Sequence, residues 1–198
     1  MSVADCRGEA EMLAVVQELQ MELPTITHGE MHTVEEANKE LDRFGTPCVG
    51  TKNMFLKSKK GELLLLTAVH TTKTDMKMIQ KAAGTKDLRF APPDVLSDNL
   101  GVVQGSVTPF ALINNIDKHN VTVLLDAHLQ TSPIPFVLHP CRNDKSCLVT
   151  FPQLERYLDK LGYTYKLVDF GAASADTAVT SGGGGGGGGG SDTHAATL

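Results

Sequence analysis

The chain has 198 residues, of which 41% are hydrophobic, and a formal net charge of −5. These values are typical of a soluble globular protein, and no apolar run approaches the roughly 20 residues that a membrane-spanning helix needs. The N-terminal stretch MSVADCRGEAEM contains acidic residues and lacks the basic-then-apolar pattern of a signal peptide, so we expect a cytoplasmic protein.

The sequence offers little support for metal or cofactor chemistry. The four cysteines contain no CxxC pair and have no histidine at zinc-finger spacing, so we expect reduced thiols. His28 and His32 are four residues apart, but Gly29 lies between them and no third ligand is near. Neither a Walker loop nor a dinucleotide-binding fingerprint is present. We therefore expect no metal and no cofactor.

The first half of the chain predicts helices around a β-hairpin. The signals are the helical spacing of apolar residues, a capping box, and two apolar runs that flank a Gly-containing turn. In chain order they predict a helix over Glu9–Glu22, a helix from Thr33 to about Leu41 or Phe44, a hairpin with its turn at Ser58–Gly61, a helix over Asp75–Ala83, and a short helix between Pro92 and Gly101.

The second half predicts strands and one further helix. Thr150, with Gln153 three residues later, predicts a helix that ends at Leu161, just before Gly162. Several strand connections are too short for parallel crossovers, which favours an α+β fold with a mixed, mainly antiparallel sheet. The predicted strands are Ala111–Asn114, Val121–Asp126, Phe136–His139, Ser146–Val149 and Tyr165–Asp169.

The chain divides into one domain and a tail. Residues 1–170 suffice for a single domain with its own core. Residues 171–198 contain the nine-glycine run Gly182–Gly190, which cannot bury apolar surface, so we expect a disordered, Gly-rich tail. It is either a linker to another domain or partner, or a low-complexity tail.

Four sequence blocks in one order carry a resemblance to a known family. They are KNMFLKSKKGELLLLTAVH from Lys52, GSVTPFAL from Gly105, VTVLLD from Val121 and LHPCRND from Leu138. Together they resemble the YbaK/prolyl-tRNA-synthetase-associated editing domains, with the closest likeness to the subgroup that deacylates alanyl-tRNA(Pro). The resemblance extends from about Glu9 to Asp169. It implies a single domain with a curved, barrel-like sheet and helices packed outside.

The resemblance also implies a chemistry. A synthetase that admits proline cannot firmly exclude the smaller alanine, because a few missing methylenes give only about 1–3 kcal/mol of discrimination, and a second hydrolytic site must remove the error. The implied function is a trans-editing hydrolase of mischarged alanyl-tRNA(Pro). Two alternatives stay open: a deacylase of another small amino acid, cysteine or serine, and a non-catalytic tRNA-binding or synthetase-complex module.

Three groups of residues are candidates for that chemistry. By resemblance, Lys52 contacts the substrate end, where an ammonium can polarise the ester carbonyl. Gly105 opens a loop whose backbone N–H groups can hold an oxyanion, and His139 adjoins the pocket that measures side-chain size. An exposed lysine, an ordinary loop and a structural histidine are the plain alternatives. The substrate-binding residues are expected to be Asn53, Ser106, Val107, Thr108, Pro109 and Leu138.

The charge distribution favours a nucleic-acid partner. Residues 1–44 hold three Lys/Arg against ten Asp/Glu, whereas residues 45–170 hold fifteen against eleven. We expect tRNA contacts from Lys57, Lys59, Lys60, Lys73 and Lys77, with a solvated lysine-rich face as the alternative. The expected partner is the acceptor end of mischarged tRNA(Pro), with prolyl-tRNA synthetase or a synthetase complex as a further candidate. No membrane partner is expected.

Overall fold

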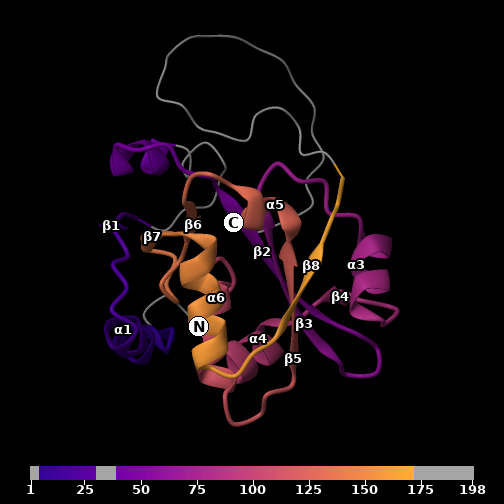
Figure 1. Cartoon of the computed structure of the whole chain (residues 1–198). Helices are drawn as coiled ribbons and strands as arrows, with labels where there is room; N and C mark the ends of the chain where they lie inside the picture. The colour runs from indigo at the N-terminus through magenta and orange to yellow at the C-terminus, as the bar shows by residue number, and fades with distance from the viewer. Residues whose placement is uncertain (1–4, 30–38, 172–198) are drawn as a thin grey trace.

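Two β-sheets form the centre of the protein in the computed structural model, which describes residues 5–29 and 39–171 (Figure 1). The larger sheet has five strands in the order β4-β2-β3-β5-β8, and the smaller has three in the order β1-β7-β6. The strands of the larger sheet are β2 (Thr51–Lys57), β3 (Leu63–Val69), β4 (Arg89–Phe90), β5 (Val121–Asp126) and β8 (Tyr165–Val168). Those of the smaller sheet are β1 (Thr25–Thr27), β6 (Phe136–Leu138) and β7 (Lys145–Val149).

The predicted hairpin is confirmed. β2 and β3 pair antiparallel over their full length, from Thr51 opposite Val69 to Lys57 opposite Leu63. The turn between them closes with a hydrogen bond from Gly61 N to Ser58 O, and Gly61 has a φ of 90°, which glycine adopts without strain. All seven residues of β3 are buried, as expected of the central strand of a covered sheet.

The mixed sheet is confirmed, but a barrel is not found. β3 pairs parallel with β5, and β5 pairs parallel with β8, whereas the other pairs in both sheets are antiparallel. Among the described residues no sheet is closed or curled. The two sheets meet at one corner, where Val49 forms an isolated parallel bridge with Phe136 and Thr51 Oγ1 donates to Val137 O at 2.6 Å.

The helix boundaries follow local signals, except that the helix predicted over Glu9–Glu22 ends at Glu18. Asp75 caps α3 (Met76–Ala83) by accepting from Lys77 N, and Thr150 and Gln153 form the predicted capping box of α6 (Phe151–Lys160). Other α-helices with described bounds are α1 (Glu9–Glu18), α4 (Pro93–Leu100) and α5 (Ala127–Thr131). The start of the helix predicted from Thr33 lies outside the described residues, but residues 39–41 are α-helical and the short 3₁₀ helix η2 (Asp42–Phe44) follows them.

One predicted strand is wrong. Ala111–Asn114 belongs to a 3₁₀ helix, η3 (Pro109–Asn115), because Thr108 caps its first turn by accepting from Phe110 N and Pro109 fixes φ at its first position. The predictions also missed β1, β4 and α5, which have three, two and five residues.

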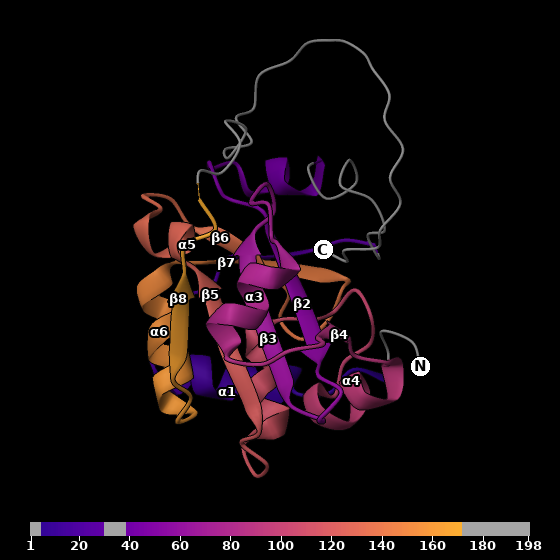
Figure 2. The same cartoon turned by 90° about the vertical axis from the view of Figure 1, so that its right-hand side faces the viewer.

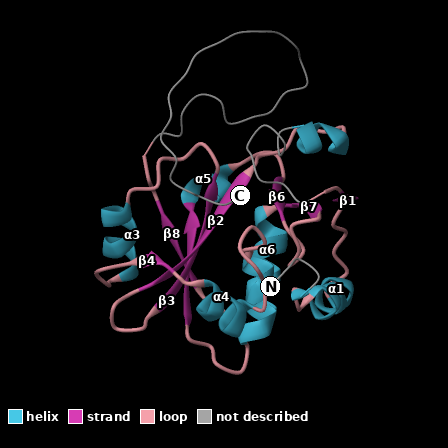
Figure 3. Ribbon diagram, turned by 180° about the vertical axis from the view of Figure 1, so that it is seen from behind, coloured by secondary structure: helices cyan, strands magenta, loops and turns pink. Residues whose placement is uncertain are grey.

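Apolar clusters cover the two faces of the larger sheet. Phe55, Leu65 and Leu125 point to the main core, which also contains Met12 of α1 and Tyr157 of α6. Met54, Leu66 and Leu124 point to the opposite face, where Ile79 of α3 packs. Figure 2 shows α3 lying across the strands of the larger sheet. Figure 3 shows the molecule from behind, with α6 and α1 on the opposite side of that sheet from α3. Within the described residues, no helix is long and apolar enough to cross a membrane.

Candidate active site

Lys52 lies near the start of β2, with its side chain partly buried. Its ammonium donates a hydrogen bond to the carbonyl oxygen of Thr72, in the loop after β3. Burial lowers the pKa of Lys52, while the charge of Asp126 acts in the opposite direction. Since an ammonium has three donors, the bond to Thr72 leaves two for another acceptor.

Asn53 and Lys52 leave β2 on opposite faces of the sheet. Lys52 is on the face of Met54 and Leu56, which pack under α3. Asn53 is buried on the other face, where its Oδ1 accepts from Thr67 Oγ1 at 2.7 Å across the hairpin. The side chain of Asn53 therefore ties β2 to β3.

The loop from Gly105 to Pro109 is buried throughout. Gly105 has a φ of 90°, and Ser106 N donates to Val103 O, so that N–H is engaged within the turn. Among the described residues, neither Val107 N nor Thr108 N has a hydrogen-bond partner. Because buried backbone N–H groups are nearly always paired, these two are candidates for holding a substrate oxygen.

A hydrogen bond connects this loop to the predicted histidine region. Asn143 N donates to Ser106 Oγ at 3.1 Å, and both residues are buried. The loop that follows His139 therefore lies directly against the Gly105 loop. Within the described residues no hydrogen bond joins Lys52 to either loop, but its neighbour Thr51 donates to the carbonyl oxygen of Val137, next to Leu138.

His139 is a buried, neutral imidazole. Its Nδ1 donates to the carbonyl oxygen of Lys145 at 2.8 Å, which leaves Nε2 as an acceptor. Burial lowers the pKa of His139 to about 4, and the ring of His28, with its centroid 6.3 Å away, adds to that effect. At neutral pH the imidazole therefore accepts a hydrogen bond rather than acting as a cation.

Leu138 faces away from His139. It is 1% exposed and belongs to the main core with Phe136, whereas His139 lies on the face of Val137. Any effect of Leu138 on a substrate pocket must therefore act from the core side of β6.

The five predicted tRNA-binding lysines divide between two ends of the larger sheet. Lys73 directly follows Thr72, which binds Lys52, and Lys77 is in the first turn of α3; both are exposed. Lys59 and Lys60 lie in the hairpin turn, and Lys57 ends β2. At about 3.3 Å per residue, Lys57 is about 17 Å from Lys52 along the strand.

Sequence reasoning missed Asp126, a fully buried carboxylate at the end of β5. Its Oδ2 accepts from Thr72 Oγ1 at 2.6 Å and from Val69 N, and its Oδ1 accepts from His128 N and His128 Nδ1. Asp126 therefore positions the loop whose carbonyl binds Lys52. An acidic residue at the end of the apolar run VTVLLD was the available signal.

The buried cysteines are unsuited to nucleophilic chemistry. Burial raises the pKa of Cys147 to about 12 and raises that of Cys141 further. The thiolate, which is the nucleophilic form, is therefore scarce at neutral pH. Cys6, Cys48, Cys141 and Cys147 are all free, as predicted, and the described residues contain no cluster that could hold a metal ion.

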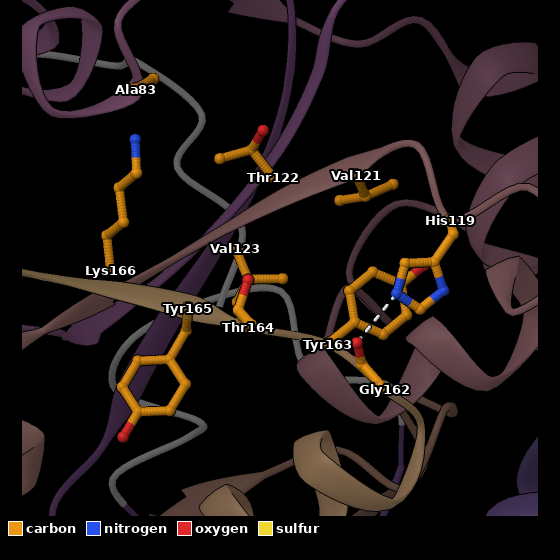
Figure 4. A pocket seen from close by; sticks show the side chains of 10 residues that line it. All are labelled: Ala83, His119, Val121, Thr122, Val123, Gly162, Tyr163, Thr164, Tyr165 and Lys166. Atoms are coloured by element: carbon orange, nitrogen blue, oxygen red, sulfur yellow. Dashed lines mark hydrogen bonds between the residues drawn. The ribbon is translucent and has the colours of Figure 1, made fainter.

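A hollow of about 360 Å³ lies at the other end of the sheet from Lys52 (Figure 4). There the ring of His119 stacks on Tyr163 with centroids 4.1 Å apart, and His119 Nε2 bonds Gly162 O at 3.0 Å. Tyr163 in turn bonds Asn115, so the polar groups of this stack are satisfied inside the protein. None of the predicted site residues lines this hollow, which is separate from the candidate active site.

The fold is an α+β domain in which a buried glycine loop lies against a neutral histidine. Comparison with known proteins identifies the family to which this domain belongs. Residues 28–157 match the model of the aminoacyl-tRNA editing domain. The chain is 29% identical over 166 residues to the prolyl-tRNA editing protein ProX of Acetoanaerobium sticklandii, covering 83% of this chain and 99% of that protein. It is 31% identical over 167 residues to prolyl-tRNA synthetase associated domain-containing protein 1 of Danio rerio, covering 84% and 88%.

Solved structures show the same fold. A structure described as a candidate trans-editing enzyme for prolyl tRNA synthetase superposes with a TM-score of 0.62 at 17% identity, covering 82% of this chain and 98% of that one. The chain therefore belongs to the aminoacyl-tRNA editing domain family, as the four sequence blocks predicted.

Proposed function

We propose that this protein is an aminoacyl-tRNA deacylase that acts in trans and hydrolyses the ester of mischarged alanyl-tRNA(Pro). Family membership supports the reaction class, and the names of the relatives support the link to prolyl-tRNA. The observation that carries the proposal is the partly buried ammonium of Lys52, which binds a carbonyl oxygen and keeps two donors for the substrate.

Water attacks the ester carbonyl carbon, and negative charge develops on the carbonyl oxygen. The bond from that carbon to the ribose oxygen then breaks, the amino acid leaves with a free carboxyl group, and the ribose oxygen takes up the proton released by water. Lys52 stabilises that charge or the adjacent phosphate. The N–H groups of Val107 and Thr108 supply a second, backbone source of stabilisation, since both are buried and unpaired among the described residues. The expected catalytic role of Gly105 is to place these N–H groups through its positive φ.

In this scheme, His139 positions the attacking water or a ribose hydroxyl and does not transfer a proton. With its pKa lowered to about 4, it is a weak base at neutral pH. Its Nε2 accepts a hydrogen bond from the attacking water or from a ribose hydroxyl, and the Lys145 carbonyl fixes the ring for this purpose. The vicinal ribose hydroxyl can then orient the water.

Selectivity for alanine over proline requires a size limit, because both esters present the same carbonyl and the same ribose. We place that limit between the Gly105 loop, from Ser106 to Pro109, and the segment of Leu138 and His139. The hydrogen bond from Asn143 to Ser106 supports the placement, since it holds these segments together. Asn53 supports the hairpin end of the site from within the sheet.

The test is hydrolysis of Ala-, Cys-, Ser- and Pro-tRNA(Pro), measured side by side under single-turnover conditions. The proposal predicts fastest hydrolysis of Ala-tRNA(Pro) and negligible hydrolysis of Pro-tRNA(Pro). Faster hydrolysis of the cysteinyl or seryl ester would assign another substrate. Tight tRNA binding without hydrolysis of any ester would replace the enzyme with a tRNA-binding or synthetase-complex module.

A further inference from the structure

Four charged side chains join the start of α1 to the loop that follows His139. The carboxylate of Glu9 lies 2.5 Å from Lys145 Nζ and 3.5 Å from Arg142 Nε. Arg142 in turn donates two hydrogen bonds to the carboxylate of Asp144, at 2.8 Å and 2.5 Å. The exposed fractions of these side chains lie between 23% and 32%, and their charges cancel. An isolated surface ion pair contributes little, but a partly buried network with a bidentate arginine holds its members in one geometry.

The loop between β6 and β7 carries the contacts that orient the candidate imidazole. His139 Nδ1 donates to the backbone carbonyl of Lys145, the residue whose ammonium binds Glu9. Two positions earlier, Asn143 N donates to Ser106 Oγ and so fixes the same loop against a second part of the candidate site. Glu9 therefore binds a segment whose backbone contacts both parts of the candidate site.

This loop has a strained turn directly after His139. Cys141 has a φ of 64°, in the left-handed region that non-glycine residues seldom adopt, and Cys141 N donates to His139 O at 2.9 Å. A strained backbone conformation persists only where the surrounding structure enforces it. Arg142 is the next residue, and its bonds to Glu9 and Asp144 restrain the exit of the turn. Removing the charge of Glu9 should therefore release part of this restraint.

The other end of the cluster is fixed to the body of the protein. Just before α1, Arg7 N donates to Gly101 O at 2.8 Å, and Arg7 O accepts from Asn114 Nδ2 at 3.1 Å. Within the first turn of the helix, Met12 is fully buried in the main core. Glu9 lies between these two attachments, so its carboxylate has a fixed position from which to hold the loop.

We propose that Glu9 is a positioning residue for the deacylation. Through Lys145 and Arg142, its carboxylate holds the loop that orients the His139 imidazole and lies against the Gly105 loop. The inference rests on the proposed function and adds α1 to the elements that build the site. Glu9 takes no part in proton transfer or bond breaking, and among the described residues it contacts none of the predicted tRNA-binding lysines. Its loss should therefore slow the reaction of bound substrate and leave the affinity for tRNA unchanged.

Single-turnover hydrolysis of Ala-tRNA(Pro) over a range of enzyme concentrations separates the saturating rate from the half-saturating enzyme concentration. Glu9→Gln keeps the size of the side chain and removes its charge. It should lower the saturating rate about tenfold, since small displacements of reacting groups are costly, and change the half-saturating concentration less than about twofold. Glu18→Gln is the matched control, because Glu18 is also on α1 and pairs with Lys160 of α6. It should keep the wild-type values.

Lys145→Gln tests whether Glu9 acts through the loop. This variant alone should also lower the saturating rate about tenfold. The variant with both Glu9→Gln and Lys145→Gln should be within about threefold of either single variant, because both changes break the same contact. A loss of about 100-fold in the double variant, the product of two independent effects, would overturn the inference.

The state of the His139 ring has a measurement that needs no hydrolysis. In ¹⁵N NMR spectra, the ring signals of His139 are those missing from His139→Gln. The wild type and Glu18→Gln should show a protonated Nδ1 and an unprotonated Nε2, as the bond to the Lys145 carbonyl requires. In Glu9→Gln, part of the population should carry the proton on Nε2 instead.

Three further results would overturn the inference: a saturating rate in Glu9→Gln equal to that in Glu18→Gln, a loss of affinity alone, or an unchanged His139 tautomer in Glu9→Gln. A tautomer change specific to Glu9→Gln, combined with no deacylation by the wild type, would support the positioning of His139 by Glu9 and contradict only the proposed function.

Discussion

Gly105 and Gly61 share a backbone φ of 90° but lie in different surroundings. Gly105 is buried in the loop against the His139 region, whereas Gly61 is exposed in the hairpin turn, and a Cβ added there would meet no atom within 4 Å. Replacing each glycine by alanine therefore separates the effect of backbone strain on stability from the effect of a moved loop on the candidate site.

Replacing Gly105 by alanine should abolish most hydrolysis of every ester. An L-residue at this φ is strained, and any shift of the loop moves the N–H groups of Val107 and Thr108. Both replacements should lower the free energy of unfolding by a similar amount, about 1 kcal/mol, but Gly61→Ala should leave the rate of hydrolysis unchanged. Urea unfolding and single-turnover hydrolysis of both variants check this. Equal rates in the two variants would remove the Gly105 loop from the site.

Lys52→Ala should lower the rate of deacylation by about 10²–10³, the usual effect of losing one donor to a developing oxyanion. The fold should persist, because the ammonium binds only the Thr72 carbonyl within the described residues. Single-turnover rates and circular dichroism should be measured together, with Lys118→Ala, an exposed lysine outside the predicted tRNA-binding set, as the control. A folded Lys52→Ala protein with the wild-type rate would refute the catalytic assignment.

Asp126→Ala should reduce the free energy of unfolding by about 3 kcal/mol. The change leaves four donors without their acceptor, among them the Thr72 hydroxyl at 2.6 Å. It should also slow hydrolysis, since Thr72 positions Lys52. Urea unfolding measures the first effect, with Asp98→Ala, an exposed carboxylate, expected to stay within about 0.5 kcal/mol of the wild type. A similar result for both variants would contradict the structural role of Asp126.

Stability should depend on pH through His139. The pKa of His139 is lowered from 6.5 to about 4 in the folded protein, mainly by burial. The bond to the Lys145 carbonyl and the charge of Asp144 act in the opposite direction, and His28 adds to the lowering. Between pH 4 and pH 6.5, His139 binds a proton in the unfolded chain but not in the folded protein. The contribution of neutral His139 to the free energy of unfolding is therefore complete above about pH 6.5 and is lost as pH falls toward 4. The shift corresponds to about 3 kcal/mol.

Urea unfolding of the wild type and of His139→Gln at pH 7 and pH 4 tests this expectation. The wild type should lose about 3 kcal/mol more than the variant over that range. Equal losses would mean that other groups control the acid sensitivity.

Leu138→Ala should relax the size limit and raise hydrolysis of larger esters relative to alanine. Because Leu138 is 1% exposed in the main core, the change should also cost about 2–5 kcal/mol of stability. Leu112→Ala removes an equally buried leucine from the same core and is the control for that loss. If both variants keep the wild-type ratio of alanyl to larger-ester hydrolysis, the size limit lies elsewhere.

The sequence predicted those helices and strands whose boundaries carry a recognisable local signal. The hairpin, α3, α4 and α6 each have a turn glycine, a cap or an early proline at their boundaries. β1 and β4 are too short to show alternation, and each exists because a neighbouring strand offers an edge. The parallel pairing of β3 with β5 depends on a crossover through α3 and α4, which periodicity does not encode.

The candidate site was predictable as a set of residues but not as an arrangement. Sequence blocks marked Lys52, the Gly105 loop and His139 as candidates, which stay predictions, whereas the bond between Ser106 and Asn143 joins segments 37 residues apart. Asp126 was missed because its importance comes from four bonds formed only in the folded state. The opposite orientations of Leu138 and His139 follow from strand alternation, which requires a correct assignment of β6 first.

The central position of β3 has a consequence for how the protein fails when heated. Leu63–Val69 contains no charge and no proline, and it is shielded by β2 on one side and β5 on the other. Once the sheet separates, this segment has the composition of an aggregation-prone strand. We therefore expect heat-unfolded chains to associate faster than they refold, so that resistance to heat is governed by the rate of unfolding.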